Sequence, residues 1–161
     1  MEFKKRLCNS RGLTLIEVLI SLTILGIISI GIMNFFSQAY SFTNSNQKKT
    51  NAINVARNAM MYMEKQSFIQ TMKDFEDHPT KERALFICNE RYTLFWKGDP
   101  IDTGCIPISI NKIDYTVSIR SNKEEEYKAF ILPLIVKVEW SINQKKYSTE
   151  LEGVIKSEDI R

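Results

Sequence analysis

The sequence predicts an α+β protein in which one long N-terminal helix packs on a C-terminal antiparallel β-sheet head. Three observations favour this class: an apolar run occupies residues 13–36, no proline occurs before Pro79, and apolar residues alternate with polar ones in most segments after residue 83. A proline-free stretch allows one continuous helix from about residue 14 to residue 66, whereas alternation with a period of two is typical of half-buried strands.

The apolar run is long enough to cross a membrane. Its 24 residues contain one ionisable side chain, Glu17. As a helix the run would span roughly 36 Å, against about 30 Å for a hydrocarbon core. One acidic residue, Glu2, and four basic residues precede it: Lys4, Lys5, Arg6 and Arg11. A basic leader favours a cytoplasmic N-terminus, so we expect a single-pass segment with the rest of the chain outside.

Glu17 is costly in such a helix, because a carboxylate at the middle of a bilayer costs about 2.5–3.5 kcal/mol. One interpretation is local: Thr14 and Glu17 have the spacing of a capping box, in which the carboxylate accepts from the free N–H of Thr14. The other interpretation follows from Gly12. If the chain is cut after Gly12, Leu13 gains a free α-amine that Glu17 of a neighbouring chain neutralises, and Glu17 then fixes the register of stacked helices.

The start of the apolar run resembles the cleavage and methylation signature of type IV prepilins and type II secretion pseudopilins, since it reads Arg11-Gly12-Leu13-Thr14-Leu15-Ile16-Glu17. The resemblance covers residues 6–36. It implies cleavage between Gly12 and Leu13 and N-methylation of Leu13 by a prepilin peptidase/methylase. It also implies assembly with other pilin subunits through the helix, driven by a platform membrane protein and an assembly ATPase. Leu13 departs from the commoner phenylalanine or methionine.

With this interpretation the chain divides into four segments. Residues 1–12 form a leader that is removed, residues 13–36 the transmembrane and filament-core helix, residues 37–66 its amphipathic continuation, and residues 67–161 a β-rich globular head. The leader holds four of the 22 basic and one of the 19 acidic side chains, which leaves 18 of each. The mature side chains therefore sum to about zero charge and give no argument for binding nucleic acid or anionic lipid.

The amphipathic continuation has apolar residues at three- and four-residue spacing, with methionines as core filler: Ile53, Ala56, Met60 and Met63. Lys48 and Lys49 are typical of a solvated face, with a contact to DNA or another partner as the weaker alternative. Residues 67–83 are interpreted as a frayed helix end and a loop, broken at His78-Pro79.

The head is expected to contain several short strands, at residues 84–88, 91–96, 106–110, 115–120, 134–140 and 147–155. Turns are expected at residues 122–124 and 142–144, and Pro133 is expected at a strand entry. An antiparallel sheet lying on the helix is the arrangement that this order favours.

Cys88 and Cys105 are the two cysteines left after removal of the leader. An even number outside the cytoplasm favours a disulfide, which would contribute about 3 kcal/mol, and two reduced, buried thiols are the alternative. No catalytic residue, cofactor or metal site is predicted. The single histidine, His78, has no evident partner, and Asp99 and Asp102 are more typical of a turn than of a calcium site.

Taken together, these patterns predict a pilin-like structural subunit, of the minor type, rather than an enzyme. It would lie in the cytoplasmic membrane with its head outside and then in an extracellular pilus or pseudopilus, serving adhesion or motility, DNA uptake or secretion. A contact of the head with DNA or a surface receptor is a weaker expectation. The alternative is a signal-anchored or secreted extracellular binding domain that does not polymerise. In the secreted form, Ser37-Gln38-Ala39 would be the signal-peptidase site.

Overall fold

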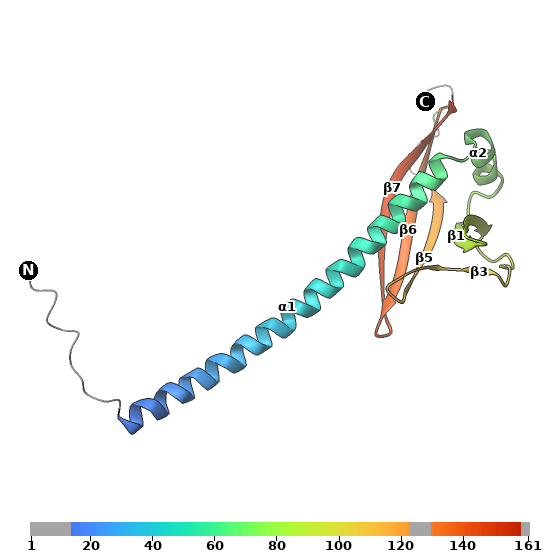
Figure 1. Ribbon diagram of the computed structural model, residues 1–161. Helices are drawn as coiled ribbons and strands as arrows, with labels where there is room; N and C mark the ends of the chain where they lie inside the picture. The colour runs from blue at the N-terminus through green and yellow to red at the C-terminus, as the bar shows by residue number, and fades with distance from the viewer. Residues whose placement is uncertain (1–13, 123–129, 159–161) are drawn as a thin grey trace, which may run out of the picture. The chain divides into compact units, whose positions relative to one another are not determined.

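A computed structural model describes residues 14–122 and 130–158 (Figure 1). The chain divides into two compact units, residues 1–45 and 46–161, and helix α1 (Leu15–Glu64) contributes to both. The expected cleavage site, Gly12 and Leu13, lies outside the described residues. A long helix followed by an antiparallel sheet confirms the predicted α+β class.

The first unit consists, in its described part, of the apolar half of α1. Hydroxyl side chains in this half donate to helix carbonyls three or four residues earlier, as when Ser21 donates to the carbonyl of Glu17 over 2.7 Å and Ser29 to that of Leu25 over 2.8 Å. These bonds satisfy polar groups without water, which suits a helix in an apolar environment.

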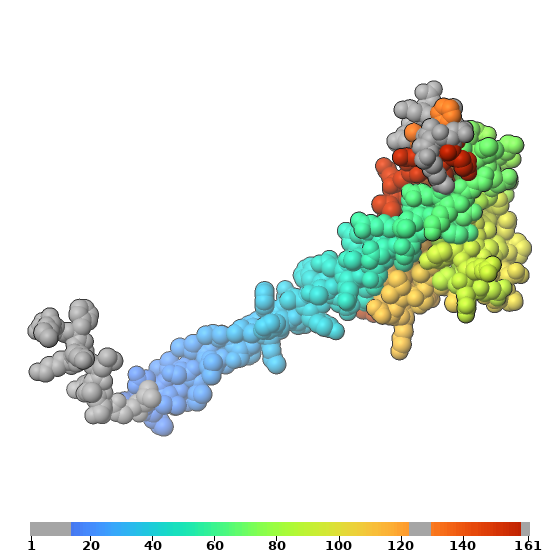
Figure 2. All heavy atoms as spheres, turned by 45° about the horizontal axis from the view of Figure 1, so that its top comes forward, coloured from blue at the N-terminus to red at the C-terminus, as the bar shows by residue number. Residues whose placement is uncertain are grey.

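The second unit begins with the last turns of α1, which pack on the sheet through one stripe of small and flexible side chains: Ala52, Val55, Ala56, Ala59, Met60 and Met63. In Figure 2 the green end of α1 lies between red atoms of the last strand and yellow atoms of residues near 90–100. The methionines are buried, as expected of core filler.

A second helix, α2 (Phe68–Asp77), occupies a segment that was expected to be a frayed end and a loop. Ser67 caps it by accepting from the N–H of Gln70 over 3.5 Å, and Phe68 and Phe75 are buried on one side. The expectation was wrong because this cap and the spacing of the two phenylalanines stabilise ten residues of helix before the chain reaches His78-Pro79.

The sheet has seven antiparallel strands in the described part of the chain, with the order β2-β1-β5-β6-β7, while β3 pairs with β1 and β4 with β5. The strands are β1 (Arg83–Cys88), β2 (Arg91–Trp96), β3 (Cys105–Ile106), β4 (Ile108–Ile110), β5 (Ile113–Ser121), β6 (Ile131–Ile142) and β7 (Lys145–Lys156). Residues 106–110 were expected to be one strand. Pro107, which has no N–H to donate, separates β3 from β4.

The face of the sheet toward α1 carries the core. Its central residues come from β5 and β6 and are at most 1% exposed: Tyr115, Val117, Ile119, Leu134, Val136 and Val138. The intervening residues of these strands point to the opposite face and are mostly polar or charged, as the period of two requires.

Two-residue turns join three pairs of neighbouring strands. Their central residues all have positive φ: Asn89 and Glu90, Asn111 and Lys112, and Asn143 and Gln144. This geometry matches the twist of the strands, and asparagine tolerates it better than most residues do. The turn expected at residues 142–144 is confirmed, and the expected turn at 122–124 lies largely outside the described residues.

Pro133 lies at the third position of β6 rather than at its entry. Its carbonyl accepts from the N–H of Asn122 over 3.0 Å, one residue beyond the end of β5. The missing N–H of Pro133 faces the same neighbour, so the return hydrogen bond to Asn122 is not made and the β5–β6 pairing ends at Ser121 and Leu134.

Candidate assembly site on the N-terminal helix

The described chain begins at the predicted capping box. The N–H of Thr14 donates to Oε2 of Glu17 over 3.4 Å, and the carbonyl of Thr14 accepts from the N–H groups of Glu17 and Val18 over 3.0 and 3.2 Å. Glu17 therefore has the contact that the local interpretation requires. The charge pairing with a neighbouring chain involves Leu13, which lies outside the described residues, and stays a prediction.

The apolar half of α1 has no packing partner among the residues that the structure describes. Its large apolar side chains are between 42% and 83% exposed, including those of Leu15, Ile27, Met33, Phe36 and Phe42. α1 is also the one described helix long and apolar enough to span a membrane, and none of that apolar stretch is buried. Exposed apolar area of this extent requires lipid or other apolar protein surface.

Gly26 and Gly31 lie within this apolar half. A methyl group added at either position would meet no described atom within 4 Å. The chain's own packing therefore gives no reason for the two glycines, although each lowers helix stability by about 1 kcal/mol relative to alanine in water. Small residues are typical of surfaces where apolar helices approach one another closely.

In the head, Cys88 and Cys105 are joined by a disulfide between directly paired residues of β1 and β3. The bond joins residues 17 positions apart in the sequence and closes a loop that contains β2 and the turn at Gly98. Asp99 donates its N–H to the carbonyl of Trp96, and the carbonyl of Asp102 accepts from the N–H of Cys105, each over 3.0 Å. Both aspartates thus take part in turn-like backbone contacts.

Aromatic stacking places His78 over Trp96, with ring centroids 4.7 Å apart. The guanidinium of Arg83 also lies over Trp96, 4.5 Å from the ring centroid, and forms an ion pair with Asp74. Within the described ranges no group of three or more histidine, cysteine, aspartate or glutamate side chains is placed to hold a metal ion. Sequence reasoning missed the contacts around Trp96, because the residues come from α2 and its C-cap, from β1 and from β2.

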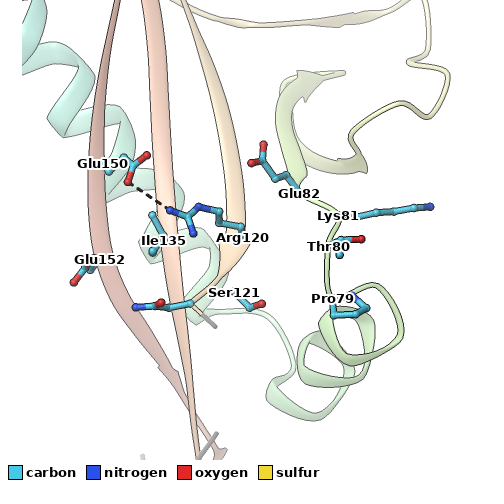
Figure 3. A pocket seen from close by; sticks show the side chains of 10 residues that line it. Pro79, Thr80, Lys81, Glu82, Arg120, Ser121, Ile135, Glu150 and Glu152 are labelled. Carbon is cyan, nitrogen blue, oxygen red and sulfur yellow. Dashed lines mark ion pairs between the residues drawn. The ribbon is translucent and has the colours of Figure 1, made fainter. Parts of the chain in front are cut away.

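The face of the sheet away from α1 carries a polar hollow of about 460 Å³, bounded by the residues before β1 and by β5–β7 (Figure 3). Arg120 points toward Glu150, with 3.6 Å between Nη2 and Oε2. Nearby, Lys97 bonds Glu82 over 2.8 Å and lowers the pKa of that carboxyl. Opposite charges pair across this face, which is typical of a solvated sheet surface.

Residues 7–33 match the family model described as the prokaryotic N-terminal methylation motif, which is the prepilin signature of type IV pilins and pseudopilins. The chain carries a prepilin signature. The motif supports a pilin-like precursor that a prepilin peptidase processes, and it indicates a structural subunit rather than an enzyme family. No curated protein and no solved structure matches the chain. The β-sheet head lies outside the matched residues.

Proposed function

We propose that the chain is a minor pilin-like subunit that is cut between Gly12 and Leu13, methylated on Leu13 and assembled through α1 into a type IV pilus or pseudopilus. One combined observation carries the proposal. A prepilin signature at residues 7–33 opens a helix whose apolar side chains stay exposed as far as Phe42. These side chains would be buried in lipid before assembly and against neighbouring helices afterwards.

Each segment then has a mechanical role. Residues 1–12 form the leader that keeps the N-terminus inside and is then removed. Residues 13–36 hold the precursor in the cytoplasmic membrane and later form the filament core, and residues 37–66 connect the core to the head. Residues 67–161 are displayed outside. A platform membrane protein and an assembly ATPase supply the extrusion step, since the chain has no nucleotide-binding loop. Glu17 sets the register by pairing with the methylated amine of a neighbouring Leu13.

The N-terminus of the chain recovered from its native cell tests this proposal directly. Mass spectrometry of the intact chain and of its N-terminal peptide should find Leu13 at the terminus with one added methyl group. A terminus at Met1 would instead identify a signal-anchored membrane protein, and a terminus at Tyr40 a secreted domain. Either of these results would overturn the filament assignment.

Substitution of Glu17 separates its two roles. Glu17→Gln keeps an oxygen that accepts from the N–H of Thr14 but removes the charge, whereas Glu17→Val removes both. If charge pairing sets the register, both variants should lower the amount of this chain in sheared filaments about tenfold or more, because an unpaired amine is left in an apolar core. Normal incorporation of Glu17→Val would contradict the register role. A defect confined to Glu17→Val would assign Glu17 to the helix cap alone.

A further inference from the structure

The two edges of the sheet differ in how far the chain itself occupies them. In antiparallel pairs, alternate residues of an edge strand point their N–H and C=O groups outward. The turn that closes the β1–β2 pair at Cys88 and Arg91 makes Tyr92, Leu94 and Trp96 the outward residues of β2. The carbonyl of Tyr92 accepts from the hydroxyl of Tyr62, and that of Trp96 from the N–H of Asp99, each over 3.0 Å. This edge is short and partly closed.

The other edge, β7, is twice as long, with twelve residues against six. Closure of the hairpin at Ile142 and Lys145, together with the bond from the N–H of Ser157 to the carbonyl of Phe130, fixes which residues bond to β6. The outward set is therefore Lys146, Ser148, Glu150, Glu152, Val154 and Lys156. Within the described ranges, no hydrogen bond reaches the outward backbone groups of these residues.

The usual protection of a free edge is weak in β7. The strand contains no proline, and its pairing with β6 runs without a bulge from Lys145 to Lys156. Its lysines lie near the two ends, while the middle of the strand carries no lysine. A long, regular edge of this kind is a template for pairing with another strand.

A groove runs beside this edge. It has a volume of about 630 Å³ and is lined on one side by α1 and on the other by the end of β7: Met61, Glu64, Lys65, Gly153, Val154 and Lys156. Met61 is 54% exposed, which is high for an apolar residue next to the core. A strand added to β7 would direct alternate side chains into this groove, and an apolar one would cover Met61.

On the face that points away from the groove, the charges of β7 determine which side chain the added strand should carry. Glu150 lies 3.6 Å from Arg120, whereas the carboxylate of Glu152 has no ion pair among the residues that the structure describes. Glu152 is exposed and belongs to the outward set. A lysine or arginine on the added strand, opposite Glu152, would therefore pair with it directly.

A second copy of the chain does not fit this edge. Two β7 strands that pair antiparallel about a two-fold axis would make their α1 helices antiparallel, whereas chains anchored in one membrane by the proposed function have parallel helices. Pairing of β7 with β2 of another copy would meet carbonyls already occupied by Tyr62 and Asp99. Neither of these pairings between copies suits the edge, which favours a different polypeptide as the occupant.

We propose that the β7 edge is a strand-addition site for an extended segment of a different protein, with a basic side chain opposite Glu152 and an apolar side chain in the groove beside Met61. The exclusion of a second copy rests in part on the proposed function, but the binding site itself does not. Main-chain hydrogen bonds would supply the affinity, and the groove and Glu152 the selectivity.

The test uses the full chain in detergent micelles and a short fluorescent peptide of alternating lysine and valine. Its control is the same peptide with the amides that face β7 N-methylated, which removes their donors. Fluorescence anisotropy should report at least about tenfold tighter binding of the unmodified peptide, because several hydrogen bonds are lost together in the control. Amide exchange at Ser148 and Glu152 should slow when the unmodified peptide is added.

Two variants, each with a matched control, test whether the peptide binds at β7. Ser148→Pro removes an outward N–H and leaves the pairing with β6 intact, so it should weaken binding about tenfold, while Ser148→Thr should not. Glu152→Lys keeps the backbone and should weaken binding of the lysine peptide, whereas Glu90→Lys, in the β1–β2 turn, should have no effect.

Equal binding of the N-methylated peptide, or binding that no β7 variant changes, would overturn the proposal. Because this assay involves neither cleavage nor assembly, its failure would leave the N-terminal mass and the proposed function unaffected.

Discussion

Glu17 accepts a hydrogen bond from the N–H of Thr14, and this contact needs no processing of the chain. A free amine exists at Leu13 only after cleavage. The two interpretations of Glu17 are therefore compatible as successive states, in which the carboxylate caps the helix of the precursor and later pairs with the amine of a neighbouring subunit. Its cost in an apolar environment is reduced in both states, because a hydrogen bond or an opposite charge compensates for the lost contact with water.

Glu82 allows a prediction of pH dependence at a single residue. The ammonium of Lys97, which bonds Glu82 over 2.8 Å, lowers the pKa of Glu82. A lowered folded-state pKa contributes stability that is present above the unfolded pKa of about 4.3 and is lost as the pH falls through the folded value. Lys97→Met should raise the pKa of Glu82 and lower the free energy of unfolding at pH 7 by at most about 1 kcal/mol, because Lys97 is mostly exposed.

The chemical shift of the Glu82 carboxyl carbon, followed by NMR as the pH falls, measures this pKa. Lys97→Arg is the matched control and should keep the pKa low. An unchanged titration of Glu82 in Lys97→Met would show that another group holds the pKa down.

Gly153 makes a second residue-level prediction. A methyl group added there would lie 2.6 Å from Cε and 2.8 Å from Sδ of Met60, so α1 and β7 approach closely only because position 153 lacks a side chain. Gly153→Ala should lower the free energy of unfolding by about 1 kcal/mol through overpacking. In a Met60→Ala background the same change should be neutral or stabilising, since alanine also restricts the unfolded chain.

Chemical denaturation of the four proteins in this cycle gives the coupling free energy. Additive effects of the two substitutions would contradict the close approach. Sequence reasoning could not have found this contact, because it joins residues 93 positions apart, and a glycine in an alternating strand carries no signal of its partner.

At the scale of elements, the strands were predictable where one face is buried and the other solvated. Apolar and polar residues alternate in β5, and in β6 they alternate from Val136 onward; both strands were expected close to their observed bounds. α2 was not expected, since its ten residues precede a histidine-proline pair and read as a loop, although Ser67 and the phenylalanines at positions 68 and 75 carried the helical signal. β3 and β4 are separated by Pro107, whose missing N–H interrupts a run of residues that otherwise reads as one strand.

The disulfide between β1 and β3 allows a prediction about stability at the scale of elements. Replacement of both Cys88 and Cys105 by alanine should lower the free energy of unfolding by about 3 kcal/mol, because the closed loop of 17 residues restricts the unfolded chain. Denaturant unfolding of the oxidised, reduced and doubly substituted proteins measures the effect. Equal stability of the oxidised and reduced proteins would show that the bond is not stabilising, and alkylation of both cysteines in protein from the native cell would favour the reduced thiols.

At the scale of the whole molecule, the prepilin signature and the core lie in different parts of the chain. The motif ends at residue 33, whereas the first buried core residue is Ala52 and the remaining ones extend to Ile155. The long, exposed apolar half of α1 was therefore predictable from the sequence, because the length of an apolar run has a direct physical meaning. The strand-addition site proposed on β7 was not predictable, because an exposed strand edge leaves almost no pattern in the sequence.

This separation predicts that residues 46–161 fold without the apolar half of α1. In the described part of the chain no core residue precedes Ala52. The bond from the hydroxyl of Tyr115 to the carbonyl of Lys48, 3.3 Å long, also lies within this fragment. The fragment should be soluble without detergent, should unfold cooperatively, and should have a midpoint close to that of the head in the full chain. Burial raises the pKa of Tyr115, so the fragment should also retain one tyrosine that titrates above pH 10.

Circular dichroism and ultraviolet titration of the fragment, beside the full chain in micelles, make this comparison. Tyr115→Phe is the control that identifies the late-titrating tyrosine. Aggregation or non-cooperative unfolding of the fragment would mean that residues 14–45 contribute to the stability of the head. The head would then not fold independently of the assembling helix, even if the N-terminus is cut and methylated as proposed.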